Sequence, residues 1–454
     1  MKRILSSLFT SLMLVAAVAA QETALLDSLA QRVASYAQRY PQETVFLHMD
    51  NTCYFQGDTI WFSVYTRQTG SGEPSRISRV LYAELLNNDG YLVERKLIEM
   101  KDGRGNGFFA LSEPLLYSGF YELRAYTRWQ LNWGIYEHPH GNYAKKWFSN
   151  REMEENYYRD YDKLYSRVFP IYDPPKEAGA YTRDMTRRVL RRQFKNDIAA
   201  AERKLRLSFY PEGGNLVAGV ENRVAFEAAW NDGEWVEGYL HVNGDSVPSE
   251  HRGRGTFTIV PFSGEEPELL FRTKDGHEVK AFLPPAENTG VSLQVNHMSD
   301  AVRFRLHAKG FLPGDSLALT VMHEGRLEDY ALLCSSATEY IFRKDSLGAG
   351  VYQLTVFDAE GHVYADRLFF VRNAEVGKSN VTVKGLKDEY APYERMDLSV
   401  EAASPCSFMS LSVKDGNHMD YLYDNGSIYT EMLLASEIKG FIPDPGWYFE
   451  ADDS

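Results

Sequence analysis

Few residues in this 454-residue chain stand at spacings that catalysis requires. The Gly-x-Ser-x-Gly nucleophile elbow, the His-Glu-x-x-His zinc motif, the Walker phosphate loop and a Cys-x-x-Cys pair are all missing from the sequence. His138 and His140 could bring two imidazoles to a metal ion, but no third or fourth ligand is evident for them. The sequence therefore predicts no enzyme, no cofactor and no metal site, and it favours a solvated loop around these histidines.

Charged side chains around the two histidines offer a second kind of chemistry. A pair of carboxylates across a cleft could hydrolyse a glycosidic bond, but sequence does not give their separation. The nearby candidates are Glu152, Glu154, Glu155, Asp160 and Asp162. A basic run follows, with Arg187, Arg188, Arg191, Arg192 and Lys195. We interpret the acidic residues as solvated surface and the basic run as the wet face of a helix, with an acidic partner or lipid headgroups as the alternative for the basic run.

Aromatic side chains are the strongest binding signal in this region. Residues 129–172 hold twelve aromatics. Tyr and Trp combine a large apolar area with a polar tip, so such a segment suits contact with protein or sugar. The predicted contact residues are Trp129, Trp133, Tyr136 and Trp147. The alternative is that these rings pack the insertion onto a neighbouring domain.

Helical periodicity marks three segments that could position these residues. One set is Tyr157, Tyr161, Leu164, Tyr165 and Val168, and a second is Leu190, Phe194, Ile198, Ala201 and Leu205. We therefore predict that residues 129–205 form a helical, aromatic-rich insertion or connector. The third helix is predicted within 21–41 from Leu25, Leu26, Leu29, Val33 and Tyr36, and we expect it to pack on the first domain.

Composition excludes several classes of protein. Hydrophobic residues make up 44% and charged residues 25%, so the chain is not disordered as a whole. Aromatics reach 13%, which favours β structure. The net charge of -14 makes nucleic acid a poor partner. Cys53, Cys334 and Cys406 are too few for a disulfide framework, which leaves one bridge or three buried thiols open.

The first 20 residues are typical of a secretion leader. Lys2 and Arg3 precede an apolar stretch, and Ala19 and Ala20 stand before Gln21. No later run approaches the roughly 20 apolar residues of a spanning helix. We expect an exported protein with no transmembrane segment in its mature chain.

A turn-and-strand motif occurs three times, at 54–64, 311–321 and 390–400. Each copy has an aromatic residue, two spacers, a turn residue, an acidic residue (Asp or Glu) and then apolar residues at every second position. This pattern predicts a turn that leads into a half-buried strand, with the acid capping or solvating the turn.

A second motif marks a later strand, at 119–126 and again at 350–357. The spacing of the motifs predicts a mainly β fold of tandem sandwiches, each of about 100 residues. The predicted units are 42–128, 206–286, 288–373 and 378–454, the last of them incomplete.

The segment 45–62, with Tyr54, Gly57 and Asp58, resembles the second macroglobulin domain of alpha-2-macroglobulin-like proteins. The segment 209–219 is similar to the next domain in exported Gram-negative proteins built from such sandwiches, some of which carry a TonB-dependent receptor plug-like domain farther along. The resemblance implies macroglobulin-like, that is immunoglobulin-like, β-sandwiches over 42–128 and 206–440. Against this family the chain looks short or truncated.

One departure from the family limits the expected activity. Protease-trapping macroglobulins form a thioester at Cys-Gly-Glu-Gln, and none of the three cysteines is followed by Gly-Glu-Gln. We therefore expect a non-enzymatic scaffold or interaction protein of the periplasm or outer membrane, which binds an envelope protein such as an outer-membrane receptor. The alternative is a glycan- or peptide-binding accessory protein of a TonB-dependent importer.

Overall fold

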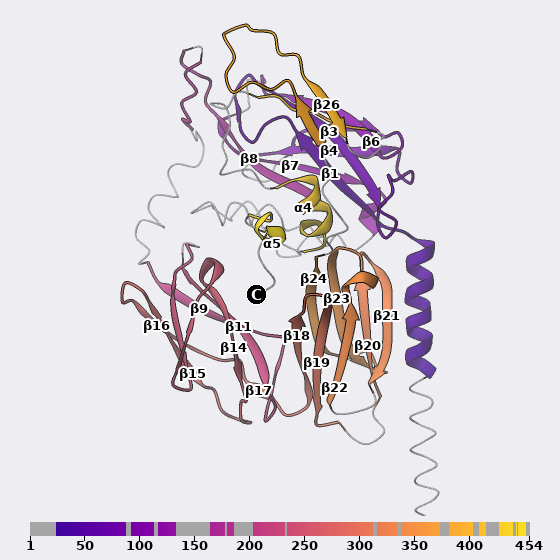
Figure 1. Ribbon diagram of the computed structural model, residues 1–454, viewed down its shortest axis with the longest axis vertical. Helices are drawn as coiled ribbons and strands as arrows, with labels where there is room; N and C mark the ends of the chain where they lie inside the picture. The colour runs from indigo at the N-terminus through magenta and orange to yellow at the C-terminus, as the bar shows by residue number, and fades with distance from the viewer. Residues whose placement is uncertain are drawn as a thin grey trace, which may run out of the picture.

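The computed structural model describes residues 24–87, 92–112, 117–132, 164–177, 179–185, 203–231, 234–311, 316–333, 337–372, 381–402, 408–414, 426–438, 442 and 444–450. Within these ranges the chain is mainly β and forms three sandwiches, which confirms the predicted fold class (Figure 1). None of the described helices is long and apolar enough to cross a membrane.

The first sandwich packs a three-stranded sheet against a five-stranded one. The three-stranded sheet has the order β1-β3-β6, with β1 at Glu43–Met49, β3 at Thr59–Gln68 and β6 at Arg104–Ala110. The other has the order β2-β8-β7-β4-β5, with β2 at Tyr54–Phe55, β4 at Val80–Leu86, β5 at Leu92–Glu99, β7 at Gly119–Thr127 and β8 at Tyr165–Tyr172. Alternating apolar residues such as Leu47, Ile60 and Phe109 fill the space between the sheets.

The second sandwich pairs the sheets β14-β11-β9 and β13-β12-β15-β16. Its strands are β9 at Leu205–Pro211, β11 at Asn222–Trp230, β12 at Gly238–Val242, β13 at Asp245–Pro248, β14 at Arg254–Ile259, β15 at Glu268–Thr273 and β16 at Glu278–Phe282. A short parallel pair, β10 at Leu216–Val217 with β17 at Ala286–Glu287, leads to the third sandwich.

The third sandwich pairs the sheets β18-β19-β22 and β21-β20-β23-β24. Its strands are β18 at Gly290–His297, β19 at Ala301–Lys309, β20 at Leu317–His323, β21 at Arg326–Leu333, β22 at Ala337–Arg343, β23 at Gly350–Asp358 and β24 at Val363–Val371. Apart from the two-residue strands β2, β10 and β17, all three sandwiches share one topology: the first, second and fifth strands form one sheet, and the other four form its partner.

The turn-and-strand motif works as its sequence predicts in two copies. In the first, Gly57 has a φ of 98°, and the Asp58 carboxylate accepts a hydrogen bond of 2.8 Å from the backbone N–H of Phe55. In the third, Tyr393 has a φ of 63°, and the Glu394 carboxylate accepts a bond of 2.9 Å from the backbone N–H of Ala391. The acid therefore caps the turn between the first two strands of its unit.

The second copy of this motif has a different position in its sandwich. It leads into β20, the third strand of its unit, whereas the first copy leads into β3, the second strand. The similar letters therefore do not mark equivalent corners, because any half-buried strand after a turn has the same pattern.

The later motif does mark equivalent strands. Tyr121 and Tyr352 each lie near the start of the sixth strand of their sandwich, and each hydroxyl donates a hydrogen bond to a carbonyl four residues upstream, Tyr117 O at 2.6 Å and Gly348 O at 3.1 Å. This contact fastens the connection that enters the strand, as the tyrosine corner of immunoglobulin-like domains does.

Three expectations about the connections require correction. The helical spacing over 157–168 is wrong for the described part, because Tyr165–Tyr172 forms β8 and extends the first sandwich beyond 128. The first helix does form over 24–39, but it packs on the third sandwich, where Leu26 is fully buried beside Ala318 and Ala359. The described part of the fourth unit is a two-stranded sheet rather than a sandwich, with β25 at Val381–Lys384 and β26 at Ser399–Ala402.

The last described residues, between 426 and 450, lie where the three sandwiches meet (Figure 1). Helix α4 at Ile428–Leu433 begins with a capping box between Ser427 and Thr430, and its Met432 joins the core of the first sandwich. Helix α5 at Trp447–Glu450 contacts the other two sandwiches. The Trp447 ring stacks on His251 of the second sandwich with ring centroids 3.9 Å apart, and the Phe449 ring lies 5.1 Å, between centroids, from Phe370 of the third.

Candidate functional site

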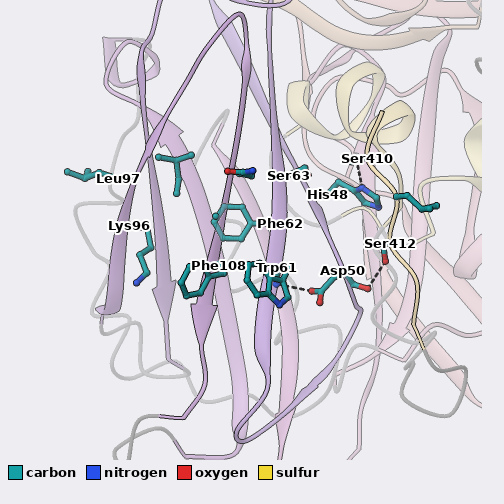
Figure 2. A pocket seen from close by; sticks show the side chains of 14 residues that line it. His48, Asp50, Trp61, Phe62, Ser63, Lys96, Leu97, Phe108, Ser410 and Ser412 are labelled. Atoms are coloured by element: carbon teal, nitrogen blue, oxygen red, sulfur yellow. Dashed lines mark hydrogen bonds between the residues drawn. The ribbon is translucent and has the colours of Figure 1, made fainter. Parts of the chain in front are cut away.

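A groove of about 590 Å³ lies on the first sandwich (Figure 2). Its floor is the outer face of β3 and β6. One wall is β5, with Lys96 and Leu97, and the other is the segment 408–414, with Ser410 and Ser412. The groove thus joins residues more than 300 positions apart in the sequence.

The segment 408–414 covers one half of this sheet face. Ser410 Oγ shares a hydrogen bond of 2.6 Å with His48 Nδ1 and accepts another of 2.6 Å from the Tyr65 hydroxyl. Ser412 Oγ donates to the backbone carbonyl of Asp50 at 2.7 Å. The segment therefore advances in step with β1, and its serine hydroxyls face the sheet.

The other half of the face is open and carries an aromatic platform. Trp61 on β3 is directly opposite Phe108 on β6, and their ring centroids lie 5.0 Å apart at 38°. Their exposed fractions are 56% and 45%. Leu97 and Leu411 extend the exposed apolar surface on the two sides of the groove. Contiguous exposed apolar groups of this kind mark interaction sites more often than single ones do.

Polar side chains lie next to the platform on the same two strands. Ser63 and Asn106 form the next cross-strand pair that faces outward. Within the described part of the chain, no side chain or backbone group forms a hydrogen bond with either of their polar side chains. They are therefore available to a ligand in the groove.

The ionisable groups of the groove are already engaged inside the chain. The Asp50 carboxylate accepts hydrogen bonds from the Trp61 backbone N–H at 3.0 Å and from the Tyr54 hydroxyl at 2.7 Å. Lys96 pairs with Glu94 and lies 5.5 Å from the centre of the Phe108 ring. Burial, with the positive charges of Arg167 and Lys414, lowers the pKa of His48, so its imidazole is neutral at pH 7.

The predicted contact residues lie elsewhere. Trp129 is half-buried, and its indole N–H donates a hydrogen bond of 2.7 Å to the carbonyl of Pro41, which fastens the end of β7 to the chain before β1. Trp133, Tyr136 and Trp147 lie outside the described residues, as do His138 and His140, the carboxylates of 152–162 and the basic run of 187–195. The structure thus leaves the predicted contact surface untested.

Sequence reasoning missed Trp61, although a signal for it exists. In the turn-and-strand motif, Trp61 holds an outward-facing position that Ala318 and Asp397 hold in the other copies. A large, exposed ring at this position is the exception among the three copies, because Ala318 is small and buried and Asp397 is polar. That exception, taken with Phe108 on the paired strand, could have identified the platform.

One other cluster in the described part has ligand-type side chains. Asp358, Glu360 and His362 lie close together in the turn between β23 and β24. The Asp358 carboxylate accepts hydrogen bonds from the His362 backbone at 2.8 Å, the His362 ring at 3.0 Å and the Tyr364 hydroxyl at 3.0 Å. These bonds account for the cluster as a stabilised turn.

Two joints fix the sandwiches to each other. Between the second and third, Glu212 lies 3.3 Å from Arg367 and accepts a bond of 3.2 Å from the Val295 N–H, while Arg223 donates to the Val295 carbonyl at 2.7 Å. Between the first and third, Arg67 pairs with Glu324.

These joints explain the role of the predicted 209–219 segment. Gly213 in this segment has a φ of 91°, and its carbonyl accepts a hydrogen bond of 3.0 Å from the backbone N–H of Asp366 in the third sandwich. The segment is therefore the joint between two domains as well as a turn within one.

No protein-family model and no curated protein matches this chain. Solved structures that resemble it include Escherichia coli alpha-2-macroglobulin activated by porcine elastase, which is 11% identical over 80% of this chain and 33% of that chain, at a TM-score of 0.25. Salmonella alpha-2-macroglobulin reacted with methylamine is 12% identical over 80% of this chain and 25% of that chain, at 0.20. Surface layer protein SbsC, domains 4–9, is 10% identical over 75% and 49%, at 0.23.

These comparisons concern the fold alone. The chain spans about a third of the first macroglobulin and a quarter of the second. The class of protein is therefore defined by its own sheets: a mainly β, tandem array of immunoglobulin-like sandwiches.

Proposed function

We propose that this chain is a non-enzymatic, exported scaffold or interaction protein of the cell envelope. Its partner in this proposal is an envelope protein, such as an outer-membrane receptor, and its place is the periplasm or the inner side of the outer membrane. The observation that carries the proposal is the locking of three sandwiches to one another, because a scaffold must hold separate surfaces in a fixed relation.

The joint between the first and third sandwiches supports this role through a buried ion pair. Arg67 of the first sandwich donates to Glu324 of the third and, at 2.7 Å, to the carbonyl of Met432 in α4. The backbone N–H of Gly70 also donates to the Glu324 carboxylate at 2.6 Å. One arginine thus ties two sandwiches and the end of the chain together.

The end of the chain supports it through aromatic packing. Within about 20 residues, Met432, Trp447 and Phe449 reach the first, second and third sandwiches in turn. A tandem array whose domains moved freely would not need such a segment.

The test combines a loosened variant with capture from envelope extracts. The double variant Arg67→Ala and Trp447→Ala removes one contact from each set while leaving most of each sandwich core intact. Small-angle scattering is expected to show a larger radius of gyration, and capture of the cross-linked envelope partner is expected to fall at least tenfold.

The matched control is Arg254→Ala, which breaks an exposed pair with Glu227 inside one sandwich and is expected to leave capture unchanged. Capture that persists in the loosened variant would refute the scaffold function. The predicted contact residues are tested in the same assay with Trp133→Ala and Trp147→Ala.

A second candidate function is a glycan- or peptide-binding accessory protein of an outer-membrane importer. The open groove with its aromatic platform favours it, because ligand sites combine apolar walls with a few well-placed polar groups. It predicts saturable binding of a soluble ligand, which the scaffold function does not require.

A further inference from the structure

The groove on the first sandwich contains two features that together select a ligand. One is the exposed ring pair of Trp61 and Phe108, and the other is the polar pair of Ser63 and Asn106 on the same strands. Alternate residues of a strand lie about 7 Å apart on one face. The rings and the polar pair are therefore within the span of one sugar ring and its hydroxyl groups.

The exposed rings are the unusual part of this surface. Covering a large apolar side chain stabilises a folded protein, so a pair of rings left open on a sheet forgoes that stabilisation. The chain covers the neighbouring half of the same face with Phe408, which lies 5.6 Å from the Tyr65 ring and 5.1 Å from the Arg104 guanidinium. The open half is thus a distinct site that adjoins a covered one.

The covered half shows what this face recognises. Both serine hydroxyls of segment 408–414 are bound by groups of the sheet. Figure 2 shows Ser410 bound to His48 and Ser412 bound to the Asp50 carbonyl. The Tyr65 hydroxyl also donates to Ser410. The sheet face therefore already binds hydroxyl groups beside aromatic rings. In the open half, Ser63 and Asn106 continue the same chemistry without a partner from the described chain.

Charge narrows the ligand class further. Asp50, Lys96 and His48 are each engaged by groups of the protein, so the groove holds no unpaired charge at its floor. A neutral polyol fits this floor better than an ion does. The backbone of β3 is paired on both sides, with β1 and β6, so β3 gives a peptide main chain no free edge to pair with. β6 and β5 are edge strands of their sheets, so binding of an extended peptide is an outcome that the test below must separate from glycan binding.

We propose that the groove binds a neutral glycan, with one sugar ring stacked on Trp61 and Phe108 and its hydroxyl groups bound by Asn106 and Ser63. A pyranose has an apolar C–H face that matches an aromatic ring, and hydroxyl groups at its rim that need donors and acceptors. This proposal gives the second candidate function a site and a ligand class, and it is independent of the scaffold function.

The test uses the purified chain without its first 20 residues, titrated with cellohexaose, maltohexaose and laminarihexaose by calorimetry. At least one of these neutral hexasaccharides is expected to bind saturably. Trp61→Ala is expected to weaken this binding at least tenfold, and Asn106→Ala about three- to tenfold, because each removes one of the two recognition elements.

Two variants separate recognition from folding. Trp61→Tyr keeps a ring in the groove and is expected to bind within about threefold of the parent chain. Trp235→Ala removes a similarly exposed tryptophan from the second sandwich and is expected to change nothing. Two further probes are hexagalacturonate, for an acidic glycan, and the synthetic peptide of residues 408–414, for an extended peptide.

Each outcome decides the matter. If none of the three hexasaccharides binds, the ligand class is overturned. If a hexasaccharide binds equally well to Trp61→Ala, the site is overturned while the second candidate function stands. Preferred binding of hexagalacturonate or of the peptide would overturn the neutral glycan. The loosened double variant should still bind the glycan, so failure of the scaffold function gives a different result.

Discussion

Two buried glutamates each lie beside two arginines, yet their pKa values shift in opposite directions. Glu84 lies within the first sandwich, and Glu212 lies at the joint between the second and third. Burial acts to raise the pKa of Glu84, but the hydrogen bonds and charge of Arg124, with Arg95 and Tyr126, outweigh it and lower that pKa. Burial raises the pKa of Glu212, and the charges of Arg367 and Arg223 do not overcome it.

The difference lies in how fully each carboxylate is bonded. Glu84 accepts bonds of 2.7 Å from Arg95, 2.7 Å from Arg124 and 3.0 Å from the Tyr126 hydroxyl. The Oε2 atom of Glu212 accepts no hydrogen bond within the described part of the chain, and Arg223 Nε lies 3.7 Å from it. The interior of the first sandwich thus provides hydrogen bonds to both oxygens of the Glu84 carboxylate, whereas the joint leaves one oxygen of Glu212 without a hydrogen bond from the described chain.

The largest effect should come from removing the satisfied carboxylate. Glu84→Ala leaves Arg95, Arg124 and Tyr126 without their shared acceptor, and we expect the free energy of unfolding of the first sandwich to fall by about 3 kcal/mol. Urea denaturation measures this loss. The control is Glu227→Ala, whose pair with Arg254 is exposed and should contribute less than about 1 kcal/mol. Equal losses in the two variants would contradict the contrast.

The next prediction concerns the backbone of the joint between the second and third sandwiches. Gly213 and Gly214 have φ values of 91° and 106°, which strain any other residue. A Cβ at Gly213 would also lie 3.1 Å from Leu293 Cβ in the third sandwich, whereas one at Gly214 would meet nothing within 4 Å.

Gly213→Ala is therefore expected to cost about 2 kcal/mol and Gly214→Ala about 1 kcal/mol, measured by thermal unfolding. The difference between the two variants isolates the close approach of the two sandwiches. If Gly214→Ala proved the more damaging, the joint would not depend on that approach.

The strands were predictable from alternation, and the joints were not. Turn residues and period-two apolar positions around Gly57 or Tyr352 gave the sandwiches, because one face of each strand is buried and the other is wet. The helical spacing over 157–168 is wrong at Tyr165 and Val168, because almost every residue of β8 is buried and no alternation distinguishes its two faces.

The groove was beyond sequence reasoning for a related reason. Its walls come from residues near 50, 97 and 411, which only the folded chain brings together. Trp61 alone left a trace in the sequence, as the one large ring at an outward position of its motif. The predicted aromatic insertion has the right composition for binding, but composition does not show which rings are exposed.

The contributions of Glu212 and Glu84 to the free energy of unfolding should change in opposite directions with pH. For Glu212, whose folded pKa is raised, the unfolded chain loses its proton first as the pH rises above about 4.3, so stability falls toward neutral pH. For Glu84, whose folded pKa is lowered, stability is present above that pH and is lost as the pH falls toward the folded pKa.

The expected result is that Glu212→Gln gains on the parent chain between pH 4 and pH 7, while the deficit of Glu84→Gln shrinks as the pH drops below 4. Unfolding free energies across this range provide the measurement. Parallel curves for the Glu212→Gln variant and the parent would show that burial at the joint does not raise the pKa of Glu212, and would contradict the contrast with Glu84.

The smallest effect lies within the Glu84 cluster itself. The Arg95 side chain is half exposed, so water already screens its charge, whereas Arg124 is largely buried between its neighbours. Arg124→Ala should therefore cost roughly 2 kcal/mol by the same denaturation assay, and Arg95→Ala should cost less. Since Glu84 keeps one arginine in either variant, the ratio of the two losses reports burial rather than pairing. A larger loss for Arg95 would mean that proximity, not solvent exclusion, sets the strength of this cluster, and the contrast with the joint would then need another cause.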